Sequence, residues 1–348
     1  MIKKTDKILV ALSGGVDSAV VLYLLKKQGY DVSAAFMKNF SEKVNIKGDC
    51  PWKEDRLMAY RVATYLKIPI QTFDFQKQYH DKIVDYIFKT YQKGQTPNPD
   101  VLCNNEIKFK LFLEQAKKLG FDKIATGHYA QIKEDKNGYH LLRGKDPNKD
   151  QSYFLSGLTQ EQLSQAIFPI GDIIKSEVRH IAKRAKLPNA EKKDSQGICF
   201  IGKIDLKTFL QQKIKSKIGD IVDTKGNKLG THPGVWYFTI GQRRGLDLAG
   251  GPWYVAKKNI KNNQLIVAKG DDEELLTKTV QISAIHWLAK EYKLPLKTKA
   301  QIRYRQAAQN VTLYKDKVIF KTGQKGVASG QILAVYQGRE LIASANII

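Results

Sequence analysis

The residues from Ser13 to Ser18, Ser-Gly-Gly-Val-Asp-Ser, have the composition of a loop that binds an anion. They follow the apolar run 8–12 and precede the apolar run 19–22, an order that predicts a strand, a tight turn and a helix. Glycines let a backbone approach an anion closely, and a helix N-terminus offers unpaired N–H groups. The run lacks the lysine of a GxxxxGK[ST] loop. We therefore expect a phosphate site unlike those of kinases and GTPases.

Three cysteines, Cys50, Cys103 and Cys199, are the other candidates for chemistry. They are too few for a disulfide scaffold, and no CxxC pair indicates a zinc site. Cys103 comes after the proline-rich run 96–102 and just before a predicted helix, whose N-terminal amides would lower the pKa of a thiol. Cys199 ends a polar loop that contains Gly197. Either residue alone is more often an inert buried side chain than a nucleophile.

The elements that must position these residues change character along the chain. Up to residue 127, predicted strands (8–12, 32–36, 70–74 and 123–126) alternate with predicted helices (17–28, 53–66, 79–91 and 104–119). This alternation indicates an α/β fold with a doubly wound parallel sheet, and ligands bind at the carboxyl ends of such strands. From residue 205 onward, hairpins and short strands predominate, typical of a small barrel. We place domain boundaries at 1–204, 205–274 and 275–348.

The charge of the chain favours a polyanionic partner. Its 58 basic and 34 acidic residues give a net charge of +24, and lysine and arginine release counterions from a phosphate backbone. A lysine-rich lineage would also produce such a surplus. No apolar run approaches the ~20 residues of a membrane span, and the N-terminus has no signal-peptide core. We therefore expect a cytoplasmic protein without a membrane partner.

Seven motifs together resemble the tRNA-specific 2-thiouridylase family, which converts the wobble uridine of certain tRNAs to 2-thiouridine. They are ALSGGVDS at 11–18, FMKNF at 36–40, TPNPDVLCNNEIKF at 96–109, ATGHYA at 125–130, LLRGKDPNKDQSYFL at 141–155, KKDSQGICFIG at 192–202 and IGQRRGL at 240–246. The resemblance implies an adenine nucleotide hydrolase-like ATP pyrophosphatase domain, a small central domain and a C-terminal β-barrel that contacts tRNA. It also implies the activity of a tRNA-uridine 2-sulfurtransferase.

The resemblance also implies a role for individual residues. ATP phosphates would be bound by Ala11, Leu12, Ser13, Gly14, Gly15, Val16, Asp17 and Ser18, with Met37 and Gly127 beside the adenosine. The target base would contact Asn98, Pro99 and Asp100. Cys103 would be the nucleophile and Cys199 would carry the persulfide sulfur. Further tRNA contacts would come from His128, Lys149, Asp150, Gln151, Arg303, Tyr304 and Gln331.

The implied reaction makes the C2 oxygen of uracil a leaving group by transferring AMP to it from ATP, which releases pyrophosphate into the SGGVDS loop, with Mg²⁺ neutralising phosphate charge. A Cys199 persulfide then attacks C2, or Cys103 first releases hydrosulfide from it. Both routes end in a Cys103–Cys199 disulfide. The base of an anticodon loop must be flipped out to react, and the sulfur comes from a cysteine desulfurase or a sulfur-relay protein. Asp100 would polarise the base, or it would be the N-cap of the following helix.

Two other functions compete with thiolation. An adenylating enzyme that acts on a metabolite would explain SGGVDS, but it would not explain two cysteine motifs and the surplus of positive charge. A non-catalytic RNA-binding protein on an enzyme scaffold would need a degraded phosphate loop or lost thiols, and the sequence retains both.

Overall fold

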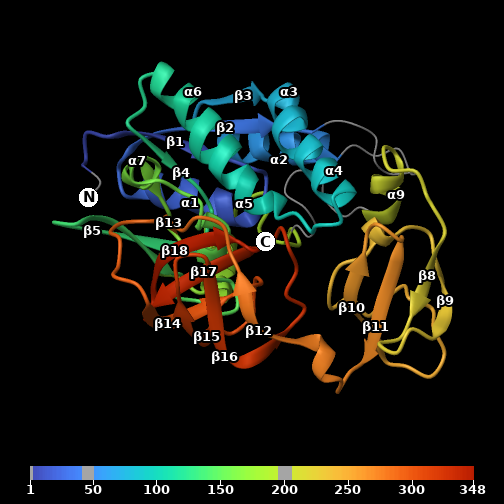
Figure 1. Ribbon diagram of the computed structural model, residues 1–348. Coiled ribbons are helices and arrows are strands. Elements are labelled where there is room, and N and C mark those ends of the chain that lie inside the picture. Colours follow the sequence, from blue (N-terminus) through green and yellow to red (C-terminus); the bar gives the residue numbers. More distant parts are fainter. Residues whose placement is uncertain (1–2, 41–50, 195–205) are drawn as a thin grey trace.

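The computed structural model describes residues 3–40, 51–194 and 206–348, and its N-terminal part is built on a parallel sheet (Figure 1). The strands are β1 (Lys7–Ala11), β2 (Asp31–Lys38), β3 (Ile70–Asp74), β4 (Lys123–Ala125) and β7 (Ala166–Ile167). Their order is β3-β2-β1-β4-β7, and every neighbouring pair is parallel. The predicted α/β class is confirmed.

Helices cover both faces of this sheet because successive strand residues point to opposite sides. Ile8 and Val10 pack with α1 (Val16–Lys27), α2 (Pro51–Tyr65) and α8 (Lys175–Arg184), whereas Leu9 and Ala11 pack with the helices that follow β3. Those helices are α3 (Gln76–Tyr79), α4 (Asp85–Gln92), α5 (Pro99–Cys103) and α6 (Leu113–Lys118), joined by the π-helical segments His80–Val84 and Asn104–Phe112. All four strand residues are buried.

The helix predicted to begin near residue 104 begins five residues earlier, at Pro99. Asn98 is its N-cap and accepts a hydrogen bond from the backbone N–H of Val101 at 3.3 Å. Proline at the first helical position lacks an N–H, which would be unpaired there in any case. Cys103 therefore lies one turn inside a continuous helical run. The prediction that Cys103 lies at the start of a helix was wrong, because it is the fifth residue of α5.

The C-terminal part contains a larger antiparallel sheet that also receives a hairpin from the N-terminal half. Its strands are β12 (Leu276–Gln281), β13 (His286–Trp287), β14 (Leu296–Gln301), β15 (Gln309–Leu313), β16 (Lys317–Lys325), β17 (Ile332–Gln337) and β18 (Glu340–Asn346). The hairpin of β5 (Ala130–Asp135) and β6 (Gly138–Arg143) extends this sheet, because β18 pairs with β6 at Leu341 and Leu141. The sequence did not predict this pairing.

Residues 206–275 form a separate four-stranded sheet, shown at the right of Figure 1. Its order is β10-β11-β8-β9, with β8 (Gly219–Val222), β9 (Lys228–His232), β10 (Trp253–Asn259) and β11 (Gln264–Lys269). The two predicted hairpins are confirmed. Short helices complete the fold: Ser152–Leu155, α7 (Gln160–Ser164), α9 (Leu206–Gln211), Val235–Tyr237 and Glu273–Leu275. In the described ranges, no helix has both the length and the apolar character needed to cross a bilayer.

Arg143 links the hairpin to the C-terminal sheet. Its guanidinium donates to the buried carboxylate of Asp150 at 2.6 Å and to the side-chain oxygen of Gln301 at 2.8 Å. The same group lies 3.6 Å from the ring centroid of Tyr336, within the range of a cation–π contact. One side chain therefore connects the end of β6, strand β14 and strand β17.

We expect Arg143→Ala to destabilise the protein strongly, because it leaves the Asp150 carboxylate buried and unpaired. Removing one partner of a buried ion pair costs about 3 kcal/mol or more. Thermal unfolding followed by circular dichroism measures the effect. The control is Lys133→Ala, an exposed position on the same hairpin, for which a change below about 0.5 kcal/mol is expected. Equal stability of the two variants would contradict the assignment.

Candidate functional site

The Ser13–Ser18 turn lies at the switch point of the parallel sheet. The chain leaves β1 into this turn and enters α1, and the neighbouring strand β4 ends just before Gly127. Connections on the two sides of β1 and β4 run in opposite directions, so their carboxyl ends flank a crevice. Ser18 donates to the carbonyl of Gly15 at 3.1 Å, and its hydroxyl oxygen accepts from the backbone N–H of Ser13 at 3.2 Å. These hydrogen bonds hold the Ser13–Ser18 turn in one conformation, and this turn is called the cradle below.

Two glycines of this crevice have no room for a side chain. Gly14 has φ +78°, and a Cβ there would lie 2.2 Å from the carbonyl oxygen of Asp55. A Cβ on Gly127 would lie 3.0 Å from the backbone nitrogen of Ser18. The Ser13–Ser18 turn therefore approaches both α2 and the loop at Gly127 through backbone atoms. Such close backbone approach leaves main-chain N–H groups accessible to an anion. The glycines predicted from sequence are required by this geometry.

A cluster of charged side chains borders the cradle. Lys175, at the start of α8, contacts Asp17 at 2.6 Å and Asp194 at 2.8 Å. Lys149 and Arg179 also pair with Asp194, at 2.7 and 2.5 Å. Partial burial would raise the pKa of Asp194, but hydrogen bonds from Lys149 and Lys175 outweigh it and hold that pKa well below its usual range. Lys175, Arg179 and Asp194 were not predicted from sequence as site residues.

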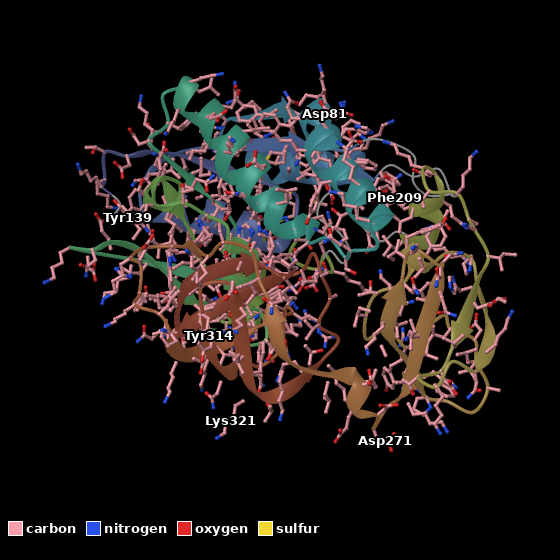
Figure 2. All side chains as sticks on the ribbon, in the orientation of Figure 1. Asp81, Tyr139, Phe209, Asp271, Tyr314 and Lys321 are labelled. Atoms are coloured by element: carbon pink, nitrogen blue, oxygen red, sulfur yellow. The ribbon has the colours of Figure 1, made fainter. Side chains whose placement is uncertain are left out.

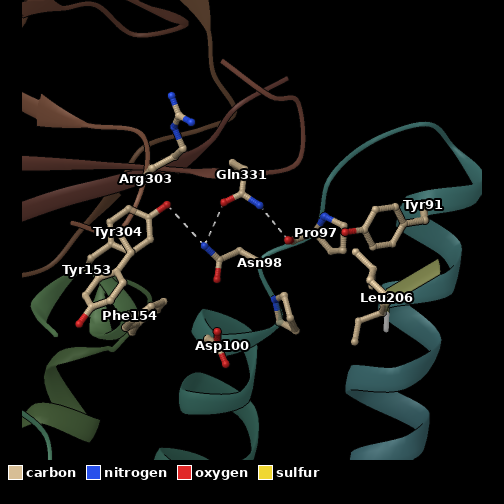
Figure 3. A pocket seen from close by; sticks show the side chains of 12 residues that line it. Tyr91, Pro97, Asn98, Asp100, Tyr153, Phe154, Leu206, Arg303, Tyr304 and Gln331 are labelled. Atoms are coloured by element: carbon tan, nitrogen blue, oxygen red, sulfur yellow. Dashed lines mark hydrogen bonds between the residues drawn. The ribbon is translucent and has the colours of Figure 1, made fainter. Parts of the chain in front are cut away.

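A pocket of about 300 Å³ lies between the N-terminal half and the C-terminal sheet (Figure 3). Its walls include the aromatic side chains of Tyr91, Tyr153, Phe154 and Tyr304, and the rings of Phe154 and Tyr304 lie 4.3 Å apart. Its polar groups are those of Asn98, Asp100, Arg303 and Gln331. Aromatic walls with a polar edge suit a planar base that has left its stack. Six residues predicted from sequence meet here, from segments about 200 residues apart: Asn98, Pro99, Asp100, Arg303, Tyr304 and Gln331.

Hydrogen bonds attach the loop 95–98 to the start of β17. The side-chain amide of Gln331 donates to the carbonyl oxygens of Pro97 at 2.8 Å and Thr96 at 3.1 Å, and its oxygen accepts from Asn98 at 3.3 Å (Figure 3). Asn98 also donates to the Tyr153 hydroxyl at 3.4 Å. Gln331 thus holds the loop in the structure, in addition to the predicted contact with tRNA.

Asp100 and Cys103 lie on the helix that begins in this pocket. Asp100 is the second residue of α5 and lines the pocket, whereas Asn98 is the N-cap. The alternative that Asp100 is the N-cap was therefore wrong. Cys103 has an exposed fraction of 0% and lies in an apolar cluster. Its thiol does not line the pocket described above.

The remaining predicted tRNA contacts lie apart from this pocket. His128 is buried beside the rings of Phe109 and Phe168, and its Nδ1 lies 2.7 Å from the Thr126 hydroxyl. Burial lowers the pKa of His128 well below its usual value, and the charge of Lys108 lowers it further. The imidazole is therefore neutral at pH 7.

The segment 149–151 joins the ion cluster to the C-terminal sheet. Asp150 accepts hydrogen bonds from Arg143, from the backbone N–H of Gly144 and from Ser152. Gln151 accepts from the backbone N–H of Tyr129 at 3.0 Å. Asp150 and Gln151 thus hold the fold locally, and their contact with tRNA stays a prediction.

Other predicted residues are only partly covered by the structure. Cys199 and Cys50 lie outside the described residues. Met37 is buried near the carboxyl end of β2. The neighbouring Asn39 is 2% exposed, and neither polar atom of its side-chain amide has a hydrogen-bond partner in the described part of the chain. The sequence signal for Asn39 was its position directly after a buried strand.

Comparisons with known proteins agree along the whole chain. Three family models match in succession: a tRNA methyl transferase HUP domain at residues 6–203, a tRNA methyl transferase PRC-barrel domain at 207–269 and an aminomethyltransferase beta-barrel domain at 277–347. Among solved structures, a 4-thiouridine synthetase–RNA complex with bound ATP covers 60% of this chain and 50% of that chain at 15% identity. The TM-score is 0.37, too low to support an argument.

Curated relatives are more informative than the solved structures. The chain is 45% identical to the tRNA-specific 2-thiouridylase of Christiangramia forsetii, over 98% of this chain and 99% of the relative. It is 44% identical to the proteins of the same name from Halalkalibacterium halodurans, over 98% and 94%, and Shouchella clausii, over 100% and 98%. Although two family models mention methyl transfer, the near full-length relatives all share one name. The chain belongs to the tRNA-specific 2-thiouridylase family.

Proposed function

We propose that this chain catalyses the ATP-dependent 2-thiolation of the wobble uridine of tRNA. The observation that supports this most strongly is the composite pocket, where a base-sized space with aromatic walls meets Asp100 and the loop 96–100. The family membership gives the reaction its name, and the crevice beside Gly14 and Gly127 gives it a nucleotide site. The three domains are proposed to be 1–204, 205–274 and 275–348.

In this proposal the chain's residues divide the work between two places. The backbone N–H groups of residues 13–18 hold the ATP phosphates, with Met37 and Gly127 beside the adenosine. The C2 oxygen of uracil takes the AMP group from ATP with release of pyrophosphate, and the adenylated oxygen is then a leaving group. The base enters the pocket, where Asp100 accepts a hydrogen bond from N3–H and thereby raises the electron density on the C2 oxygen, which attacks the α-phosphate of ATP. Sulfur arrives as a persulfide on Cys199, loaded by a cysteine desulfurase or a relay protein.

Sulfur transfer consumes one persulfide and leaves one disulfide. The terminal sulfur of the Cys199 persulfide bonds to C2, AMP departs with the former C2 oxygen, and Cys103 then breaks the remaining S–S bond to form the Cys103–Cys199 disulfide. In the alternative route Cys103 releases hydrosulfide first, and the same disulfide results. Because the Cys103 thiol is buried, we propose that it becomes accessible only when substrate occupies the pocket. An external thiol then reduces the disulfide.

Mg²⁺ is proposed to enter with the nucleotide. In residues 3–40, 51–194 and 206–348, no group of three His, Cys, Asp or Glu side chains is arranged to hold a metal ion. Mg²⁺ commonly binds through substrate phosphates, waters and one or two carboxylates. The residues present fit a metal that the triphosphate carries.

We expect chelation by EDTA to abolish the formation of both AMP and 2-thiouridine, with full recovery when excess Mg²⁺ is added. Excess Ca²⁺ is the control and should not restore AMP formation, because Mg²⁺ demands a tighter octahedral geometry that Ca²⁺ does not adopt. Thin-layer chromatography of labelled nucleotide measures AMP. Undiminished AMP formation in EDTA would contradict a role for Mg²⁺.

We expect Asp100→Asn to slow thiolation by about 100-fold or more while the KM for tRNA changes little, because the variant loses a proton acceptor but keeps its shape. Single-turnover formation of 2-thiouridine gives the rate. Thermal unfolding is the control: Asp100→Asn keeps the N-cap residue Asn98 and should leave the stability of the protein unchanged. Wild-type rates for Asp100→Asn would remove Asp100 from the chemistry.

We expect Cys103→Ser and Cys199→Ser each to abolish thiolation, but at different stages. Cys103→Ser still accepts a persulfide on Cys199, whereas Cys199→Ser accepts none at that position. Mass spectrometry of peptides after incubation with a sulfur donor separates the two. Cys103→Ala tests whether any loss at this buried site reflects packing. Sulfur incorporation into tRNA by either serine variant would rule out the two-thiol mechanism.

A further inference from the structure

A second surface groove lies on the C-terminal sheet. It is separate from the pocket lined by Asn98, Asp100 and Arg303, which we call the base pocket. It has a volume of about 660 Å³ and extends across strands β14, β15 and β16. We call it the lysine groove; its polar lining includes Lys297, Lys299, Asn310, Thr312, Lys321 and Gln337. The three lysines are exposed. Figure 2 labels Lys321 at the lower end of the molecule, away from the N-terminal helices.

Strand register places the polar side chains of the groove in rows. Lys297 is paired with Thr312, and Lys299 with Asn310, across β14 and β15. On β16, Ile319 is paired with Thr312, and Lys321 continues on the same face two residues later. One row therefore holds Lys297, Thr312 and Ile319, and the next holds Lys299 and Asn310, with Lys321 on the same face of β16.

The three lysines of the groove have no carboxylate to neutralise them. Over the described ranges, no ion pair or hydrogen bond involves the ammonium group of Lys297, Lys299 or Lys321, although many other lysines form such contacts. The surrounding segment 275–348 contains twelve lysines and arginines and only three acidic residues. Like charges held close together without counter-charges favour an anionic partner.

The groove and the base pocket are connected by two neighbouring strands. Strand β14 contributes Lys297 and Lys299 to the groove, and the chain continues from it to Arg303 and Tyr304 of the pocket. Strand β17 starts next to Gln331 of the pocket and ends at Gln337 of the groove. At ~3.3 Å per residue, four to six residues separate the sites by roughly 13 to 20 Å. A nucleic acid with one base in the pocket therefore has backbone within reach of the groove.

We infer that the lysine groove binds the sugar–phosphate backbone of the tRNA arm whose loop base occupies the pocket. This inference rests on the proposed function and adds a contact site to it. The groove has no aromatic platform at its exposed rim for reading bases, and its ammonium groups suit phosphates. It therefore positions the arm without reading its sequence, so it raises affinity for every tRNA substrate to a similar extent.

The test replaces Lys297, Lys299 and Lys321 by glutamine in the full-length protein. We expect the KM for tRNA to rise about tenfold or more at ~0.1 M salt, and the slope of log affinity against log salt to fall by up to about 3. The kcat at saturating tRNA and the KM for ATP should not change, because neither site is altered. The matched control replaces three exposed lysines elsewhere, Lys77, Lys118 and Lys136, by glutamine, and should resemble the wild type.

A further measurement, together with the binding and activity data, separates the possible outcomes. A hairpin that keeps the anticodon loop but has a shortened stem should lose the difference between variant and wild type, because the stem supplies the phosphates. If the triple variant binds tRNA with wild-type affinity and salt slope, the inference is overturned. This holds even if an acidic sulfur donor protein transfers less sulfur to the triple variant than to the wild type. If the wild type binds tRNA but forms no 2-thiouridine, the proposed function fails, while the groove's contact with RNA is still decided by the binding data.

Discussion

The attachment of the loop 95–98 to the C-terminal sheet is the interaction on which the rest of the structure depends. Thr96 donates its backbone N–H to the carbonyl of Ser329 at 2.8 Å, and Gln95 donates to the Ser329 hydroxyl at 3.0 Å. Gly330 makes the approach possible, because a Cβ there would lie 2.8 Å from the carbonyl oxygen of Thr96. Together with the Gln331 bonds, these contacts fix where α5 begins, and therefore where Asp100 and Cys103 lie.

A base pocket built in this way cannot belong to either half of the chain alone. Its walls come from α4, α5 and the Ser152–Leu155 helix on one side, and from residues 303, 304 and 331 on the other. The pairing of β6 with β18 and the contacts of Arg143 fix the position of these two halves relative to each other. Binding sites frequently lie between domains. Here the crevice beside Gly14 and Gly127 lies at the edge of the parallel sheet, while the pocket lined by Asn98 and Arg303 requires the C-terminal sheet as well.

Much of this arrangement could be predicted from sequence where local pattern decides structure. The apolar runs around β1 and β3, and the glycines of the Ser13–Ser18 turn, specify strand and turn through short-range sterics. The start of α5 was misplaced because Pro97 and Pro99 suggested a loop, although proline at the first helical position is favourable. The pairing of β6 with β18 was missed because the two strands are about 200 residues apart, and no local pattern encodes a distant pairing partner.

The same distinction explains which site residues the sequence could identify. Asn98, Asp100, Arg303 and Gln331 were found through resemblance to a family, and only the fold shows that they face one space. Lys175 and Asp194 were missed because a lysine or aspartate in a charged chain carries no local signal. Their importance arises from a half-buried lysine that contacts both the Ser13–Ser18 turn and Asp194.

Burial of Cys103 in the structure is compatible with a nucleophile that acts late in a reaction. The thiol has an exposed fraction of 0% and lies in an apolar cluster, so solvent does not reach it in this structure. In the proposed mechanism, a thiol that stays inaccessible until a base is present does not reduce the persulfide early, so sulfur is not lost as hydrosulfide. Asp100, one turn earlier on the same helix, lines the pocket that the base would enter. The proposed mechanism therefore links base binding to exposure of the thiol through α5, and it sets the order of the two chemical steps by the moment at which substrate reaches this helix.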